Sequence, residues 1–156
     1  MALTFPRGTL RKASTAQGEP LVQLDPSAFL ADPQLIHALD ARSTPVPCDS
    51  DHVLFRQGDP PVGLYILQEG VATVSMISPD GQSLFAVQAR PGSLLGVPGL
   101  VSGQPFSLSA TAGAGSRVSF VSRDDFTALM QADPLLSLKI LQVLAAEVRS
   151  ARKALR

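Results

Sequence analysis

The sequence predicts a mainly β domain with flanking helices: an antiparallel β-roll of the jelly-roll type, followed by a long C-terminal helix. Between Thr44 and Val121, short runs of β-branched and aromatic residues alternate with turn signals. The 12 Gly and 13 Pro are many for a helical bundle and suit a turn-rich β protein. Asp133-Pro134 then starts a helical pattern with no breaker before Arg156, which predicts a helix over 133–156.

The 156 residues are enough for one domain with its own core. Residues 1–23 show no clear period, and we expect them to be an N-terminal extension that docks on the domain or on a partner. Residues 24–156 form the domain. Asp32-Pro33 interrupts the amphipathic segment Ser27–Leu39, which predicts two short helices ahead of the roll.

The predicted strands share β-branched or aromatic residues and Gly or Pro boundaries, and they are His52–Arg56, Gly63–Gln68, Val71–Ile77, Ser83–Gln88, Ser107–Ala112 and Arg117–Val121. Asp80-Gly81 predicts a hairpin turn. The Gly-rich stretch 113–116 lies between two strands and is predicted to be a turn rather than a phosphate loop. After the last strand, Ser122 precedes a short helix with Phe126, Leu129 and Met130 on one face.

Composition excludes several classes of function. The 13 Lys and Arg balance the 13 Asp and Glu, which argues against an electrostatic nucleic-acid binder. Cys48 is the only cysteine, so the chain has no internal disulfide, cysteine zinc site or iron–sulfur cluster, and Cys48 is predicted to be an inert thiol. His37 and His52 are separated and are predicted to lie on the surface. We therefore expect no metal, no cofactor, no catalytic residue, no membrane span and a cytoplasmic location.

The long helix carries an apolar seam at 3- and 4-residue spacing, formed by Leu141, Leu144, Val148, Ala151 and Leu155. At about 35 Å the helix is longer than a small roll can cover, so the seam predicts a homodimer. The alternative is an amphipathic helix that packs on its own roll without a partner. Leu135, Leu138 and Ala145 widen the apolar face near the start, where we expect contact with the roll. Arg and Lys near the end stabilise the helix dipole, which explains them more simply than a nucleic-acid contact.

Three ordered motifs carry a resemblance to a known family. They are Val53-Leu54-Phe55-Arg56-Gln57-Gly58-Asp59, Leu64-Tyr65-Ile66-Leu67-Gln68-Glu69-Gly70-Val71-Ala72 and Pro91-Gly92-Ser93-Leu94-Leu95-Gly96. Together with the order of helices and strands, they resemble the cyclic nucleotide-binding domain of the catabolite-activator/FNR (Crp/Fnr) superfamily. The third motif resembles the start of that family's phosphate-binding cassette. The resemblance implies a regulatory domain that senses a signal, is involved in transcription regulation and dimerises through the long helix.

The cassette departs from the family pattern at its charged positions. The family has a Glu for the ribose 2′-hydroxyl and an Arg for the cyclic phosphate. Val97 follows Gly96 where the Glu would stand, and Phe106 stands in place of the Arg, followed by Ser107 at the small hydroxyl position. Burying a phosphate without a paired cation is costly, and no Arg or Lys lies between Pro91 and Arg117. Pro98 and Gly99 are also expected to break the short helix that usually follows the Glu.

These observations predict a sensor domain with a degenerate cassette that does not bind cyclic AMP or cyclic GMP in the usual way. A small-molecule ligand would contact Gly96, Val97, Phe106, Ser107 and Leu108 together with the long helix, and would signal by shifting that helix. One alternative is a ligand-free structural or protein-interaction module, with the roll packed shut by Val97 and Phe106. A jelly-roll metalloenzyme is disfavoured by the two separated histidines. Because the sequence ends at Arg156 without a helix-turn-helix module, we expect no direct DNA binding by this chain.

Overall fold

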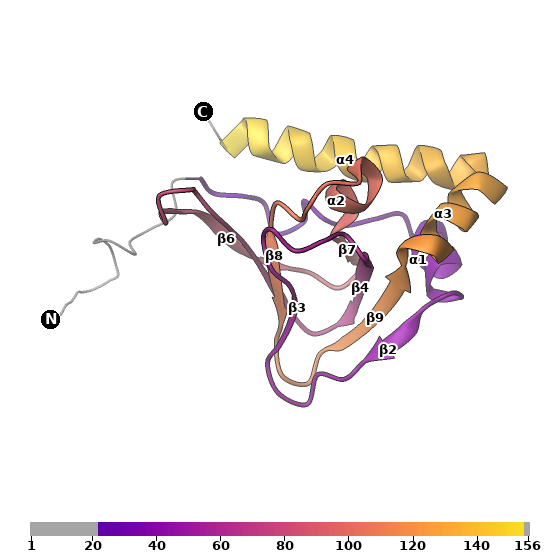
Figure 1. Ribbon diagram of the computed structural model, residues 1–156, viewed down its shortest axis with the longest axis horizontal. Helices are drawn as coiled ribbons and strands as arrows, with labels where there is room; N and C mark the ends of the chain where they lie inside the picture. The colour runs from indigo at the N-terminus through magenta and orange to yellow at the C-terminus, as the bar shows by residue number, and fades with distance from the viewer. Residues whose placement is uncertain (1–21, 155–156) are drawn as a thin grey trace, which may run out of the picture.

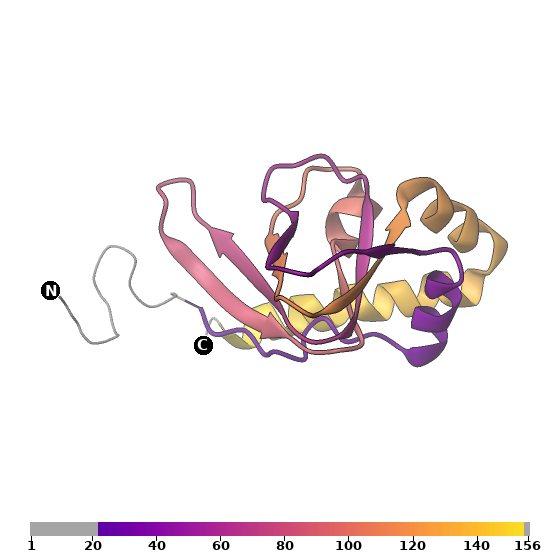
Figure 2. The same cartoon turned by 90° about the horizontal axis from the view of Figure 1, so that it is seen from below.

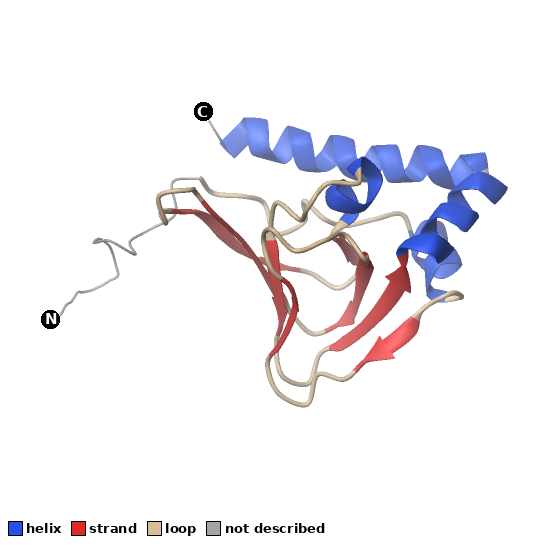
Figure 3. Ribbon diagram, in the orientation of Figure 1, coloured by secondary structure: helices blue, strands red, loops and turns tan. Residues whose placement is uncertain are grey.

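A computed structural model describes residues 22–154 and shows an antiparallel β-roll with a long helix lying across one side (Figures 1 and 3). The predictions that fall on residues 1–21, and on Leu155, lie outside the described residues. The elements in chain order are α1 (Pro33–Asp40), β2 (Thr44–Val46), β3 (His52–Phe55), β4 (Gly63–Glu69), β5 (Ala72–Ile77), β6 (Ser83–Ala89), β7 (Ser93–Leu95), α2 (Val97–Ser102), β8 (Ser109–Ala112), β9 (Arg117–Ser122), α3 (Arg123–Ala132) and α4 (Pro134–Ala154).

The strands form two four-stranded sheets, and every pairing is antiparallel, which confirms the predicted β-roll. The orders are β2-β9-β4-β7 and β3-β8-β5-β6. The hairpin of β5 and β6 turns at Gly81 with φ +86°, a left-handed value that suits glycine, and it projects beyond the rest of the roll (Figure 2). The sequence prediction missed β2 and β7, which have only three residues each.

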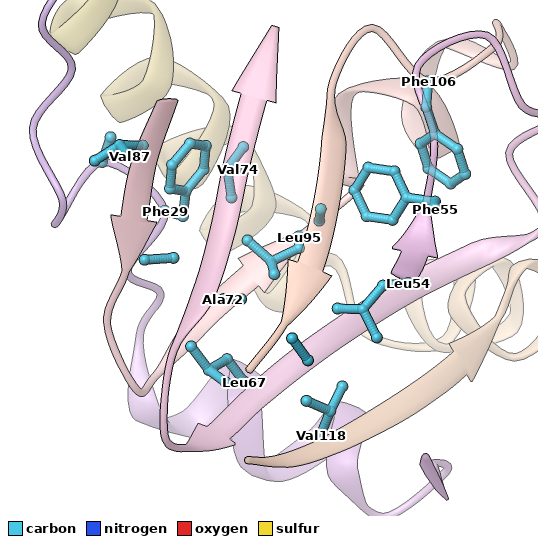
Figure 4. Close-up of a cluster of buried hydrophobic side chains, with 14 of the residues drawn as sticks. Phe29, Leu54, Phe55, Leu67, Ala72, Val74, Val87, Leu95, Phe106 and Val118 are labelled. Carbon is cyan, nitrogen blue, oxygen red and sulfur yellow. The ribbon is translucent and has the colours of Figure 1, made fainter. Parts of the chain in front are cut away.

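Strand β4 separates two hydrophobic clusters, because successive side chains of a strand point to opposite faces. Tyr65 and Leu67 belong to the cluster inside the roll, part of which is drawn in Figure 4. Leu64 and Ile66 belong to the second cluster, which joins the roll to all four helices. Movement of any helix against the roll must therefore rearrange this second cluster.

The segment before the roll contains one helix, so the prediction of two short helices was wrong. Residues 26–29 form a turn, and Leu30 bridges Ser93 in an isolated antiparallel pair. Asp32 caps α1 by accepting hydrogen bonds from the backbone N–H groups of Gln34 and Leu35, and Pro occupies the first turn. The Asp32 carboxylate also accepts a 2.8 Å ion-pair hydrogen bond from Lys139 Nζ, which ties α1 to α4.

The expectation that Pro98 and Gly99 break the cassette helix was also wrong, since α2 spans Val97–Ser102. Pro98 lies in the first turn, where the missing N–H has no intrahelical acceptor to lose. Gly99 lies next to Phe106: a Cβ at Gly99 would come within 3.1 Å of Phe106 Cδ1 and 3.2 Å of the Gln104 carbonyl oxygen. The glycine allows α2 to approach the loop that follows it.

No single helix among residues 22–154 has the length and apolar character needed to cross a membrane. Helices α3 and α4, which meet at a sharp bend, are long and apolar enough only when they are counted together. Within the same residues, no group of three or more His, Cys, Asp or Glu could hold a metal ion. His37 and His52 are exposed, as predicted, and Cys48 is buried. Burial raises the pKa of the Cys48 thiol, which keeps it in the less reactive protonated form.

Candidate functional site

The cassette is the segment from Gly96 to Leu108, which leaves β7, forms α2 and returns to β8. Its two bends are glycines in the left-handed region, Gly96 with φ +93° and Gly103 with φ +70°. Gly96 is also short of space, because a Cβ there would lie 3.0 Å from Phe106 Cε1. The cassette backbone therefore depends on glycine for its conformation and for room beside the Phe106 ring.

Phe106 fills the position that the resemblance assigns to a phosphate-binding arginine. Its side chain is 3% exposed, and its ring stacks on Phe55 with the centroids 4.1 Å apart (Figure 4). The backbone of Phe106 is fixed to the preceding turn: its N–H donates to the Asp59 carbonyl at 2.9 Å, and its carbonyl accepts from the Gly58 N–H at 2.7 Å. Stacking on Phe55 therefore fixes the ring, and two backbone hydrogen bonds fix the main chain of Phe106.

Aromatic packing continues from Phe106 across the roll. Phe55 lies 5.8 Å from Tyr65, and Tyr65 lies 5.1 Å from Phe120, between ring centroids. Burial raises the pKa of Tyr65, so its hydroxyl stays neutral near pH 7. The sequence reasoning did not pick out Phe55 or Tyr65 as site residues, although both lie inside the motifs that carry the resemblance.

The structure brings together some of the predicted cassette residues and not others. Gly96 and Phe106 are buried next to each other inside the roll, whereas Val97, which has no exposed surface, belongs to the second cluster, between the roll and the helices. Leu108 is half-buried and packs against the cluster inside the roll. Ser107 is exposed. The buried part of the cassette is consequently apolar and offers neither a carboxylate nor a guanidinium to a ligand.

Helix α4 faces the roll with a stripe that the sequence analysis did not single out. Leu136, Ile140 and Val143 are buried, and the next residue at this spacing is Glu147, which is half-buried. Burial raises the pKa of the Glu147 carboxyl to about 8. The 4,3,4 spacing from Leu136 to Glu147 is a sequence signal for this stripe and for its acid. The sequence prediction used only the neighbouring apolar seam and missed Glu147.

The predicted seam lies on a different face of the same helix. Leu141 is 58% exposed and Val148 is 50% exposed; Ala151 is exposed and Leu144 is half-buried. The expectation that Leu135, Leu138 and Ala145 pack on the roll was wrong, because all three are exposed. Their positions on the helix place them beyond the seam rather than on the buried stripe. The outward apolar surface of α4 is thus wider than the seam alone.

Comparison with known proteins agrees with this geometry. The sequence profile described as "Cyclic nucleotide-binding domain" matches residues 45–133, which include strands β3 to β9, the cassette and α3. The chain belongs to the cyclic nucleotide-binding domain family. The match confirms the resemblance found from the three glycine-containing motifs, and the β-roll with its long helix is the fold of that domain.

Curated relatives of this cyclic nucleotide-binding domain are regulators. The chain is 28% identical over 118 residues to the "CRP-like cAMP-activated global transcriptional regulator" of two strains of Mycobacterium tuberculosis, covering 76% of this chain and 53% of the relative. The chain spans about half the length of the curated relatives it matches. This cyclic nucleotide-binding domain therefore resembles the sensor part of CRP-like regulators.

Solved structures share the fold at lower sequence identity. The Thermus thermophilus catabolite activator protein superimposes with a TM-score of 0.69 at 24% identity, covering 80% of this chain and 58% of that chain. The sensor domain of the transcriptional regulator DNR from Pseudomonas aeruginosa gives 0.59 at 23%, covering 75% and 79%. A Thermotoga maritima transcriptional regulator gives 0.64 at 21%, covering 77% and 94%.

Proposed function

We propose that the chain is a non-enzymatic regulatory domain of the Crp/Fnr type that does not bind cyclic AMP or cyclic GMP in the usual way. The observation that carries the proposal is the burial of the Phe106 ring, at the position that the resemblance assigns to the family's phosphate-binding arginine. We also propose a cytoplasmic location, on the evidence of one buried cysteine.

The energetic argument concerns the charge of the ligand. A cyclic nucleotide carries one negative charge, and burying an unpaired charge is strongly unfavourable. The Arg fork that would pair with a phosphate is replaced by a hydrocarbon ring. Displacing Phe106 would also break its 4.1 Å stack on Phe55 and the packing of Gly96 and Gly99 against the ring. The Val97 side chain has no acceptor for a ribose hydroxyl.

Calorimetric titration with cyclic AMP and cyclic GMP tests this proposal. We expect no binding in the micromolar range. The Mycobacterium regulator, whose name describes it as cAMP-activated, is the positive control for the nucleotide stock. Micromolar binding by the unaltered chain would show that the degenerate-cassette proposal is wrong.

Dimerisation through α4 is the second part of the proposal. On the outward face, at least half of the Leu141 side chain and half of the Val148 side chain are exposed. Leu144 and Ala151 extend this face at heptad-like spacing. Covering such side chains is favourable by about 1.5–3 kcal/mol each when burial is complete. A sedimentation experiment is expected to show a dimer. A monomer at high protein concentration would contradict the proposal.

In this arrangement α4 lies between its own roll and a partner. A signal molecule that entered between the cassette and α4 would shift the helix and change the dimer. We propose no direct DNA contact for the residues of this chain, because its net charge is zero and the Arg and Lys near the end of α4 are explained by the helix dipole.

The packed cassette also favours a second candidate function, a protein-interaction module that needs no small molecule. Phe55 and Phe106 fill the roll as core residues do. The two candidates differ in a ligand screen: a sensor gains thermal stability from its ligand, whereas a ligand-free module does not. A metalloenzyme would instead contain metal by elemental analysis.

A further inference from the structure

A groove of about 530 Å³ lies outside the roll and is lined by residues of α2, α3 and α4. Its floor contains the buried side chains of Leu100, Phe126 and Ile140, and its walls contain Val101, Met130 and Leu141. Leu141 also belongs to the proposed dimer seam, whose other described residues lie outside the groove. The volume falls in the range of about 300–1,000 Å³ that is usual for small-molecule sites. Leu100 and Val101 of the cassette line the groove from α2, but the predicted ligand contacts Gly96, Val97 and Phe106 do not, so the groove lies outside the nucleotide site of the family.

One cation stands at the end of this groove. Arg123 begins α3, and its Nη2 lies 3.5 Å from the point that a Cβ on Gly103 would occupy. The ion pairs found among residues 22–154 involve Arg42, Arg117 and Lys139, and none involves Arg123. No acidic side chain lines the groove. An apolar trough with one unpaired guanidinium and no carboxylate complements a ligand with an anionic head and an apolar tail.

We propose that the groove binds a medium-chain carboxylate. The carboxylate would accept two hydrogen bonds from the Arg123 guanidinium, which presents its donors as a planar fork. The alkyl chain would run along α3 past Phe126 and Met130. Arg123 and Gln131 are eight residues apart on one helix, so the trough extends about 12 Å from its charged end. Such a ligand bridges α2, the cassette helix, and α4, without entering the roll.

Methionine methyl NMR tests the proposal directly. The groove contains Met130, whereas Met76 packs against the cluster inside the roll and serves as an internal reference. On titration of the ¹³C-methyl-labelled chain with decanoate, we expect the Met130 signal to shift and the Met76 signal to stay. Met130→Leu assigns the signal. Equal shifts of both methyls, or no shift of Met130, would overturn the proposal.

Two matched arginine substitutions identify the head-group contact. Arg123→Gln is expected to weaken decanoate binding about tenfold, as loss of a charge-assisted contact does, and to leave decan-1-ol binding unchanged. Arg117→Gln, at the opposite end of β9, is the control and should change neither. The proposal is wrong if Arg123→Gln and Arg117→Gln behave alike. It is also wrong if the Met130 signal depends on protein concentration and ignores decanoate, since a second copy would then cover the groove.

Discussion

The two apolar faces of α4 have nearly the same spacing in sequence but opposite environments in the structure. The inward face contains Ile140 and Val143 and continues to the acid Glu147. The outward face contains Leu141 and Val148 and carries no acid. A helix in a monomer would be expected to bury its more apolar stripe. Here the stripe that continues without an acid is the exposed one, and this asymmetry supports the proposal that a second copy covers it.

The largest expected effect is a difference in unfolding free energy between substitutions at two neighbouring residues, one on each face of α4. Ile140→Ala should lower the free energy of unfolding by about 3 kcal/mol, because Ile140 is 4% exposed and its loss leaves a cavity. Leu141→Ala, one residue along, should change it by less than about 0.5 kcal/mol in the monomer. Urea unfolding at a protein concentration too low for dimers measures both. Equal costs would mean that the inward and outward faces are wrongly assigned.

The next prediction concerns the acid on the inward face. Because the folded-state pKa of Glu147 is raised to about 8, the folded protein holds a proton that the unfolded chain, with an ordinary value of 4.5, has released. Stability should therefore fall as the pH rises from about 4.5 to 8, and the loss should remain above that range. Glu147→Gln should remove this slope and stabilise the protein by about 2 kcal/mol at pH 8.5.

Urea unfolding as a function of pH tests the Glu147 prediction. Glu69→Gln is a suitable control, because Glu69 is exposed on β4 and pairs with Arg117. A slope that survives in Glu147→Gln would show that another group causes it.

Most strands of the roll could be predicted from the sequence, whereas the buried face of α4 could not. Gly and Pro punctuation predicted six strands of the roll, since turns with positive φ at residues such as Gly81 need a glycine. The assignment of Leu135 and Leu138 to the roll failed, because 3- and 4-residue spacing fits more than one stripe on a helix. Only tertiary contacts decide which stripe is buried.

The cassette shows the same division between what the sequence predicts and what packing decides. Val97 and Phe106 were singled out from their positions in the motif, and both are buried, but Phe106 lies in the cluster inside the roll and Val97 in the cluster beneath the helices. The helix over Val97–Ser102 was missed because a proline in the first turn was treated as a breaker. The stack of Phe106 on Phe55 joins residues about fifty positions apart, and no local pattern predicts such a contact.

A smaller effect is expected on the outward face. Val148→Ala should weaken the dimer about tenfold, or by ~1.4 kcal/mol, because each protomer loses apolar surface from the seam. Leu135→Ala, also exposed on α4 but outside the seam, should leave the dimer unchanged. Sedimentation equilibrium gives the dissociation constants. If Leu135→Ala has the larger effect, the dimer uses another part of the helix.

The smallest expected effect concerns the ion pair between Lys139 of α4 and Asp32 at the start of α1. The hydrogen bond from Lys139 is the main cause that holds the pKa of Asp32 below its usual value. The stability that this carboxylate contributes is present above its ordinary pKa of 3.8 and is lost as the pH falls through the lower folded-state value. Lys139→Gln should raise the pKa of Asp32, whereas Arg117→Gln, which removes the exposed pair with Glu69, should not. Carboxyl NMR titration measures the shift. An unchanged pKa in Lys139→Gln would show that the backbone N–H groups of Gln34 and Leu35 hold the carboxylate without help from α4.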